Sequence, residues 1–143
     1  MVNKSLKHTL AENIKHIRTE KDYSQEFLAE LANVNRNYPG KIERCEANVT
    51  IDVIGRIAKS LNTTISILLG GSDSNKKHLK TISLFSKNVK KYRLANNWSQ
   101  DDLAKRGINR SVISSVENEQ NVTINTVEKF AKALKVNAYK LFE

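Results

Sequence analysis

The stretch Ser24-Gln25-Glu26-Phe27-Leu28-Ala29 decides the fold, because its pattern returns later in the chain as Ser99-Gln100-Asp101-Asp102-Leu103-Ala104. The Ser-Gln and Leu-Ala pairs recur at a spacing of 75 residues. A serine just before an apolar-periodic stretch is typical of a helix N-cap, since its hydroxyl accepts a hydrogen bond from an open backbone N–H group. Both stretches therefore predict the start of a short helix at an equivalent point of a repeated unit.

The similarity between the two stretches extends in both directions along the chain. The further matches are Arg18 with Arg93, Asn35-Arg36 with Asn109-Arg110, Glu43 with Glu117, and Asn48-Val49-Thr50-Ile51 with Asn121-Val122-Thr123-Ile124. The spacing falls from 75 to 74 and then to 73 residues, which two one-residue deletions in loops explain. We infer one unit of about 60 residues used twice, each copy long enough to hold its own core.

A polar segment separates the two copies. Residues 70–75, Gly-Gly-Ser-Asp-Ser-Asn, are small or polar and lack apolar periodicity, which is typical of a flexible linker. We expect a first domain over 1–70, a linker over 71–78 and a second domain over 79–143. The copies differ in charge: residues 1–75 carry ten basic and nine acidic residues, a net of +1, whereas residues 76–143 carry fourteen and six, a net of +8.

The composition limits the class of protein. The 143 residues carry a net charge of +9, so polyanions are the natural partners. The single cysteine, Cys45, excludes an intrachain disulfide and a cysteine-rich zinc site and fits a reducing compartment. No apolar run approaches the roughly 18 residues of a membrane helix, and the N-terminus lacks the apolar core of a signal peptide. We therefore expect a cytoplasmic protein without a membrane partner, and the five glycines and one proline favour helices.

Apolar periodicity predicts the first helix of each copy. Leu6, Leu10, Ile14 and Ile17 form one stripe in the first copy, and Phe85, Val89 and Tyr92 do so in the second. A second helix should follow Ser24 or Ser99, with Ser99 and Asp102 approximating a capping box. It should end near Leu31 or Lys105, and Asn35 or Asn109 should cap a third helix. Two short helices joined by a turn of three or four residues form the helix-turn-helix pattern.

At this point the sequence resembles the Xre-type helix-turn-helix family, which includes lambdoid phage repressors, restriction-modification controller proteins and many antitoxins. The matching residues are Arg18, Ser24-Gln25-Glu26, Leu28-Ala29, Asn35-Arg36-Asn37-Tyr38, Ile42-Glu43-Arg44 and Ile57-Ala58 with Leu61, and in the second copy Arg93, Ser99-Gln100, Leu103-Ala104, Asn109-Arg110-Ser111, Val116-Glu117-Asn118 and Phe130-Ala131 with Leu134. The resemblance implies an all-α fold of two tandem five-helix, lambda-repressor-like domains joined by a short flexible linker.

The resemblance also implies which side chains contact DNA. In this family the N-terminal residues of the third helix face base edges in the major groove. Those positions are Arg36, Asn37 and Lys41 in the first copy and Arg110, Ser111, Ser114 and Ser115 in the second. Further phosphate contacts are expected from Gln25 and Gln100 in the first turn of the second helix, and from Arg44 and Asn118 just past the third.

Two further features bear on these assignments. The resemblance implies that Arg18 with Glu43, and Arg93 with Glu117, form partly buried structural ion pairs between the first and third helices. The first copy departs from the family at Pro39-Gly40, where the second keeps Ile113-Ser114. Because proline lacks an N–H, the third helix of the first copy should begin later or be distorted. This makes the second copy the safer DNA binder.

No residue constellation in the sequence supports catalysis, and we expect no enzyme activity, no cofactor and no metal. His8, His16 and His78 form no metal-ligand spacing with one another or with Cys45. The sequence therefore predicts a sequence-specific regulator that binds a double-stranded DNA operator, either as a pseudo-dimer within one chain or as a homodimer. The alternative is an antitoxin or other protein-interaction module whose first domain binds a protein partner or dimerises.

The apolar tails of the two copies, residues 65–69 and 139–142, are where relatives of the resembled family often associate. They could equally close the cores of their own domains.

Overall fold

The computed structural model describes residues 4–72 and 81–143, and the elements found there are helical. The first copy contains α1 (Leu6–Glu20), α2 (Gln25–Ala32), α3 (Tyr38–Glu43), α4 (Ile51–Ser60) and α5 (Ile65–Leu68). The second contains α6 (Thr81–Ala95), α7 (Gln100–Ala104), α8 (Arg110–Glu117), α9 (Ile124–Leu134) and the 3-10 helix η1 (Ala138–Phe142). The all-α, doubled helix-turn-helix architecture is confirmed. The predicted linker lies outside the described residues except for Gly71 and Ser72, and the domain boundaries stay a prediction.

The two copies build their turns in the same way. Each helical unit contains non-glycine residues with left-handed backbone conformations, and three of these positions recur in both copies: Asp22 and Asn97, Cys45 and Glu119, and Asn62 and Lys135. Cys45 and Glu119, both with φ of 61°, stand where the resembled family usually has a turn glycine. The side chain of Cys45 faces its own copy, with Sγ 3.8 Å from the carbonyl oxygen of Lys7. The Cys45 thiol therefore packs against α1 of its own copy.

The apolar stripes predicted from periodicity form the core. Leu10, Ile14, Phe85 and Val89 are buried on the inner faces of α1 and α6, while Ile17 and Tyr92 are half-buried. The ring of Phe85 packs edge-on against one phenylalanine of α9 and is stacked on another in η1. A single cluster of buried apolar side chains runs through both copies. The copies therefore share one core across their contact.

The backbones of the two copies exchange hydrogen bonds at the centre of the molecule. The N–H of Ile51 donates to the carbonyl of Val122 at 2.9 Å, and the N–H of Ile124 donates to the carbonyl of Val49 at 2.7 Å. Between them, residues 50 and 123 form an isolated antiparallel bridge. Each bond has its counterpart from the other copy, as in the self-complementary interface of a two-fold dimer.

Side chains repeat this reciprocity at the starts of α4 and α9. The Oδ1 atom of Asn121 accepts a bond from the N–H of Asp52 at 3.3 Å, and the Oδ1 atom of Asn48 accepts one from the N–H of Asn125 at 3.2 Å. Each copy thus caps a helix of the other, because the first N–H groups of a helix lack partners within it. The contacts α1 with α9 and α4 with α6 are also equivalent to each other.

The apolar tails meet across the same interface. α5 packs against η1, with Leu68 and Leu141 completely buried. The hydroxyl of Ser66 donates to the Oε1 atom of Glu143 at 3.2 Å. The tails thus close the core of their own copy and also associate with each other inside one chain.

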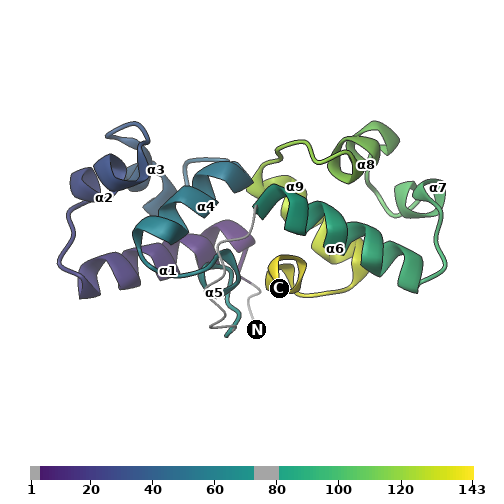
Figure 1. The fold of residues 1–143 in the computed structure, drawn as a ribbon, viewed down its shortest axis with the longest axis horizontal. Coiled ribbons are helices and arrows are strands. Elements are labelled where there is room, and N and C mark those ends of the chain that lie inside the picture. Colours follow the sequence, from purple (N-terminus) through teal and green to yellow (C-terminus); the bar gives the residue numbers. More distant parts are fainter. Residues whose placement is uncertain (1–3, 73–80) are drawn as a thin grey trace.

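This interface places the two helix-turn-helix units in a defined arrangement. α3 and α8 lie along the same edge of the molecule, towards its two ends, while α5 and η1 lie on the opposite side (Figure 1). The loops that lead into α4 and α9 meet between them (Figure 1). The approximate two-fold axis therefore passes between the units and leaves both third helices on one face.

The two-fold relation is broken where α1 meets α9. The Oε2 atom of Glu128 accepts a hydrogen bond from the N–H of Leu6 at 2.7 Å and so caps α1 from the other copy. The equivalent of Glu128 in α4 is Gly55, and the equivalent of Leu6 is Thr81. A Cβ atom on Gly55 would lie 3.1 Å from the Thr81 hydroxyl. The glycine therefore leaves room for α6.

We expect Glu128→Ala to lower the free energy of unfolding by about 1 kcal/mol, the usual cost of losing a side-chain cap. The N–H of Leu6 then has no acceptor in the protein. Glu128→Gln keeps an acceptor oxygen and should retain most of the stability. Urea unfolding followed by circular dichroism would measure both variants. Equal losses for alanine and glutamine would show that the hydrogen bond contributes nothing and only the charge matters.

Candidate nucleic-acid interface

The second copy forms the helix-turn-helix as the sequence predicts. The hydroxyl of Ser99 accepts a bond from the N–H of Asp102 at 3.0 Å, and the Asp102 carboxylate accepts one from the N–H of Ser99 at 2.8 Å. This is the predicted capping box of α7. The side chain of Asn109 accepts a bond from the N–H of Ser111 at 2.9 Å and caps α8. Local hydrogen bonds thus fix the start of α7 and the start of α8.

α8 has one buried face and one polar face. Ile113 and Val116 are buried against the core. The predicted base-reading and phosphate-contacting residues of this copy lie on the other side: Arg110, Ser111, Ser115 and Asn118 are exposed, and Ser114 and Gln100 are half-buried. The structure therefore brings these side chains to one surface at the end of the molecule.

The first copy has a shorter third helix, and one part of the sequence-based interpretation is wrong. α3 begins at Tyr38, so Asn35 does not cap it, and Arg36 and Asn37 lie in the turn before the helix. The Asn35 side chain instead accepts a bond from the N–H of Asn37 at 2.9 Å within that turn. Pro39 occupies the first turn of α3, where its missing N–H costs no helical hydrogen bond. The sequence left open a later start or a distorted helix, and the structure shows the later start.

The remaining candidates of the first copy gather around Gly40. A Cβ atom at Gly40 would lie 3.1 Å from Oε1 of Gln25 and 3.0 Å from Nη1 of Arg44. The absence of a side chain at this position therefore lets the two predicted phosphate contacts approach each other. Lys41 and Arg44 are exposed, and Gln25 is half-buried.

Arg44 has an acidic partner that its counterpart lacks. Its Nε atom lies 3.1 Å from Oε1 of Glu46, and this hydrogen bond raises the pKa of Arg44 and lowers that of Glu46. The equivalent residues of the second copy are the uncharged Asn118 and Gln120. The amide of Asn118 lies 3.5 Å from the hydroxyl of Ser114 instead.

Both predicted base-reading arginines are held by an acidic residue that the sequence interpretation did not single out. Arg36 Nη2 lies 2.7 Å from Oε1 of Glu26, and Arg110 Nε lies 2.8 Å from Oδ1 of Asp101. Each acid is the second residue of its helix, and the two acids are 75 residues apart, as the serine caps are. This recurrence in the sequence was the signal that could have identified them. All four side chains are exposed, so each pair contributes at most about 1 kcal/mol and opens readily.

The two predicted structural ion pairs, Arg18 with Glu43 and Arg93 with Glu117, lie beneath the exposed candidate residues. Arg18 makes two bonds to Glu43, at 2.9 and 2.8 Å, and a third at 2.7 Å to the carbonyl of Tyr23. Arg93 makes the same three bonds to Glu117 and to the carbonyl of Trp98. The side chains of Arg93 and Glu117 are only 9% and 7% exposed. The pairs therefore join the first helix to the third and to the loop before the second, away from solvent.

We expect Arg93→Ala to lower the free energy of unfolding by about 3–5 kcal/mol, because it leaves the Glu117 carboxylate buried without a counter-charge. Thermal unfolding followed by circular dichroism would measure the loss. Replacing both partners, Arg93→Met with Glu117→Leu, removes the stranded charge and should recover part of the stability. A stable, fully folded Arg93→Ala protein that fails to bind DNA would instead give this arginine a direct role in binding.

The capping box makes part of the stability depend on pH. The hydrogen bond from the backbone of Ser99 is the main cause that lowers the pKa of Asp102 below its ordinary 3.8, with help from the serine hydroxyl, Lys105 and Arg106 against the opposing effect of desolvation. A carboxyl with a lowered pKa in the folded state stabilises the fold above its unfolded-state pKa and loses that effect as the pH falls through the folded-state value.

Thermal unfolding should therefore show the native protein more stable than Asp102→Asn at neutral pH. The two melting temperatures should converge as the pH falls below about 3.8 and the carboxylate is protonated. Melting curves recorded over this acidic range would test it. A difference that stays constant with pH would show that the ionised carboxylate has no special role in the cap.

Within residues 4–72 and 81–143, no helix is both long and apolar enough to cross a membrane. The same part of the chain contains no group of three or more histidine, cysteine, aspartate or glutamate residues placed to hold a metal ion.

The helix-turn-helix family matches residues 14–68 and 89–141, which include both motifs just described. The chain therefore belongs to the helix-turn-helix family and is a DNA-binding transcription regulator. Matches to individual proteins are shorter, about the length of one copy. The comparison with solved structures gave no significant match.

Among known proteins, the chain is 44% identical over 64 residues to control protein C.SmaI of Serratia marcescens, an alignment that covers 45% of this chain and 76% of that protein. It is 39% identical over 56 residues to a hypothetical transcription factor of Neisseria meningitidis serogroup B, covering 38% of this chain and 53% of the relative. It is 36% identical over 62 residues to the immunity repressor protein of Bacillus phage phi105, covering 43% of each.

Proposed function

We propose that this protein is a sequence-specific regulator that occupies both half-sites of one double-stranded DNA operator with a single chain. α8 reads one major groove, and the turn before α3, with α3 itself, reads the next. The observation that carries this proposal is the reciprocal interface between the copies, which leaves both motifs on one face of the molecule (Figure 1). In dimeric helix-turn-helix proteins, half-sites lie about 34–36 Å apart on one side of the duplex.

The chemistry of the two motifs favours unlike half-sites. Arg110 can bond to O6 and N7 of a guanine, and Ser111 and Ser115 can donate to or accept from several bases. In the first copy Arg36 has the same preference for guanine, whereas Asn37 suits an adenine. Both half-sites should therefore contain a guanine for the arginine, but their other bases should differ. The operator should be asymmetric about its centre.

The interface between the copies also bears on assembly. The tails α5 and η1 cover each other within the chain, so a surface that could join two chains is already occupied. This supports binding as a monomer over binding as a homodimer.

A second candidate function rests on α2. Phe27 and Leu31 are 42% and 46% exposed, one helical turn apart, whereas Asp102 and Arg106 lie in the corresponding region of the second copy. Exposed apolar side chains one turn apart are typical of a surface that binds another protein. The first copy would then hold a protein partner, as in an antitoxin or interaction module. Comigration with a candidate partner in size-exclusion chromatography, abolished by Leu31→Asp, would favour this function.

Selection of bound sequences from a random duplex pool would test the regulator. It should give a motif of two unlike halves about one helical turn apart, with one chain per duplex by analytical ultracentrifugation. Arg110→Ala should relax one half, and Arg36→Ala the other, each by about 1–3 kcal/mol of discrimination. Lys15→Ala, an exposed change on α1, is the control and should leave the motif unchanged.

Other outcomes of the selection point elsewhere. A palindromic motif bound by two chains would show a homodimer. A motif that responds only to Arg110→Ala would make the first copy an assembly or partner domain. The absence of any motif would contradict the proposed function.

A further inference from the structure

The second copy has a cationic groove that the first copy lacks. The groove has a volume of about 490 Å³ and lies between the end of α7 and the last turns of α9. Its lining residues are Lys105, Arg106, Gly107, Lys129, Lys132, Ala133 and Lys135. The equivalent groove of the first copy is lined by Leu31, Ala32, Asn33, Arg56, Lys59 and Ser60. Five basic side chains thus stand where the first copy has two.

The acidic residues near this groove offset only part of its charge, because the Asp102 carboxylate attracts Lys105 and Arg106. Asp102 accepts the N–H of Ser99 in the capping box, and Glu128 accepts the N–H of Leu6. Glu128 is also 3.9 Å from Lys132, a long separation for an ion pair. In the part of the chain that the structure describes, Lys129 and Lys135 have no ion-pair partner. The groove therefore carries an excess of positive charge.

The first copy neutralises its own groove. Arg56 is paired with Asp52 at 3.0 Å and donates to the carbonyl of Asn33 at 2.9 Å. Lys59 is the one remaining basic residue of that lining. Because the two grooves occupy the same place in the same fold, the folding of the unit does not require the cationic lining.

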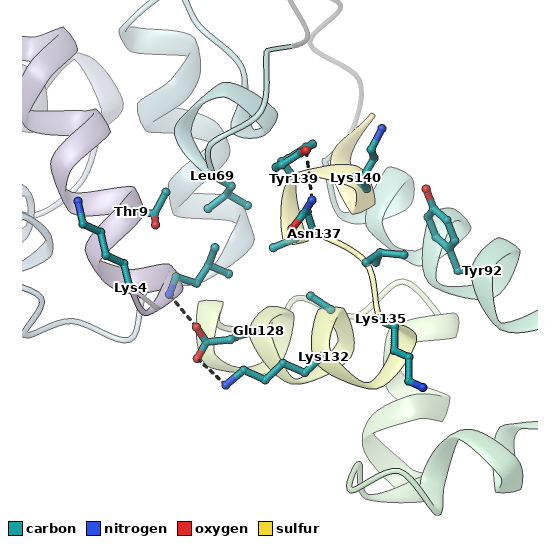
Figure 2. A pocket seen from close by; sticks show the side chains of 14 residues that line it. Lys4, Thr9, Leu69, Tyr92, Glu128, Lys132, Lys135, Asn137, Tyr139 and Lys140 are labelled. Atoms are coloured by element: carbon teal, nitrogen blue, oxygen red, sulfur yellow. Dashed lines mark hydrogen bonds and ion pairs between the residues drawn. The ribbon is translucent and has the colours of Figure 1, made fainter. Parts of the chain in front are cut away.

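The groove lies outward from the centre of the molecule. α9 begins at the bridge between the copies, and its 11 residues extend about 16 Å away from it. Lys132 and Lys135 also line a neighbouring pocket of about 610 Å³ between α1, α9 and η1 (Figure 2). That pocket adds little net charge, because Glu128 lines it and its other two lysines, Lys4 and Lys140, are paired with Glu12 and Glu143. The excess positive charge is therefore concentrated in the groove between the end of α7 and the last turns of α9.

The lining is suited to phosphate groups and not to a protein surface. Protein interfaces depend on aromatic or apolar anchors that fill pockets. This groove offers only Gly107 and Ala133, and Arg106 covers the ring of Trp98 at 3.8 Å. Lysines that neutralise phosphates need no such anchor and carry no sequence information.

We propose that this groove binds the sugar-phosphate backbone of duplex DNA beyond the half-site read by α8, independently of its sequence. The inference rests on the proposed DNA binding and adds a second binding surface to it. The second copy would then grip flanking DNA, and the first would not.

The test compares two variants of equal charge. The groove variant removes three cations from the groove by Lys105→Gln, Lys129→Gln and Lys135→Gln. The control variant removes three exposed lysines from the first copy by Lys15→Gln, Lys21→Gln and Lys59→Gln. Circular dichroism checks that both fold. The association constant for a random-sequence duplex of about 40 base pairs, near four helical turns, is measured between about 50 and 200 mM salt.

The slope of log K against log salt should be shallower by about 2–3 in the groove variant, near 0.9 for each phosphate that a lysine no longer neutralises, and should change by less than about 1 in the control. On the selected operator, hydroxyl-radical protection should reach further past the α8 half-site than past the other, and this extension should disappear in the groove variant.

Equal slope changes in the two variants would show that the salt dependence reflects only the net charge of the protein, and would overturn the proposal. An unchanged slope in the groove variant would also overturn it and would turn attention to an acidic protein partner, while DNA binding itself stands. If the native protein binds no duplex at all, the proposed function fails, and this inference fails with it.

Discussion

The reciprocal contact between the two copies is the constraint on which the rest of the structure depends. The N–H groups of Ile51 and Ile124 donate across the interface, and each copy caps a helix of the other. Backbone hydrogen bonds are directional, so these bonds fix an orientation as well as a contact. Because both copies belong to one chain, their association is intramolecular and does not depend on protein concentration. The arrangement of α3 and α8 follows from this contact (Figure 1).

Joining the copies in one chain also frees them to differ. In a homodimer the same residue occupies both sides of a two-fold interface. Here Glu128 caps α1 while its equivalent, Gly55, makes room for α6. The same freedom extends to the third helices, where Pro39 shortens α3 and Ile113 is buried in the full-length α8. As a consequence, the two copies share one pseudo-symmetric fold but have different recognition surfaces and different grooves.

Each copy has a buried and an exposed ion pair, and the two pairs have different roles. The pair of Arg93 and Glu117 is nearly inaccessible, makes two bonds, and ties the first helix to the third. The pair of Arg110 and Asp101 is exposed and joins the second helix to the start of the third. A buried pair is costly to break, whereas an exposed pair exchanges readily with water. The first therefore supports the motif, and the second holds a candidate DNA-reading side chain that can still be released.

The sequence by itself determined the doubled all-α unit, because caps and apolar stripes such as Ser99 and Phe85 to Val89 are local signals. It also indicated the partners of Arg18 and Arg93 through the resemblance, and it showed that Pro39 would disturb the third helix. Only the tertiary structure decided how the copies meet, since Thr50 and Thr123 are helix N-caps 73 residues apart and no local signal pairs one with the other. The same holds for the cationic groove: Lys105 and Lys129 come from separate helices, and only packing brings their charges together.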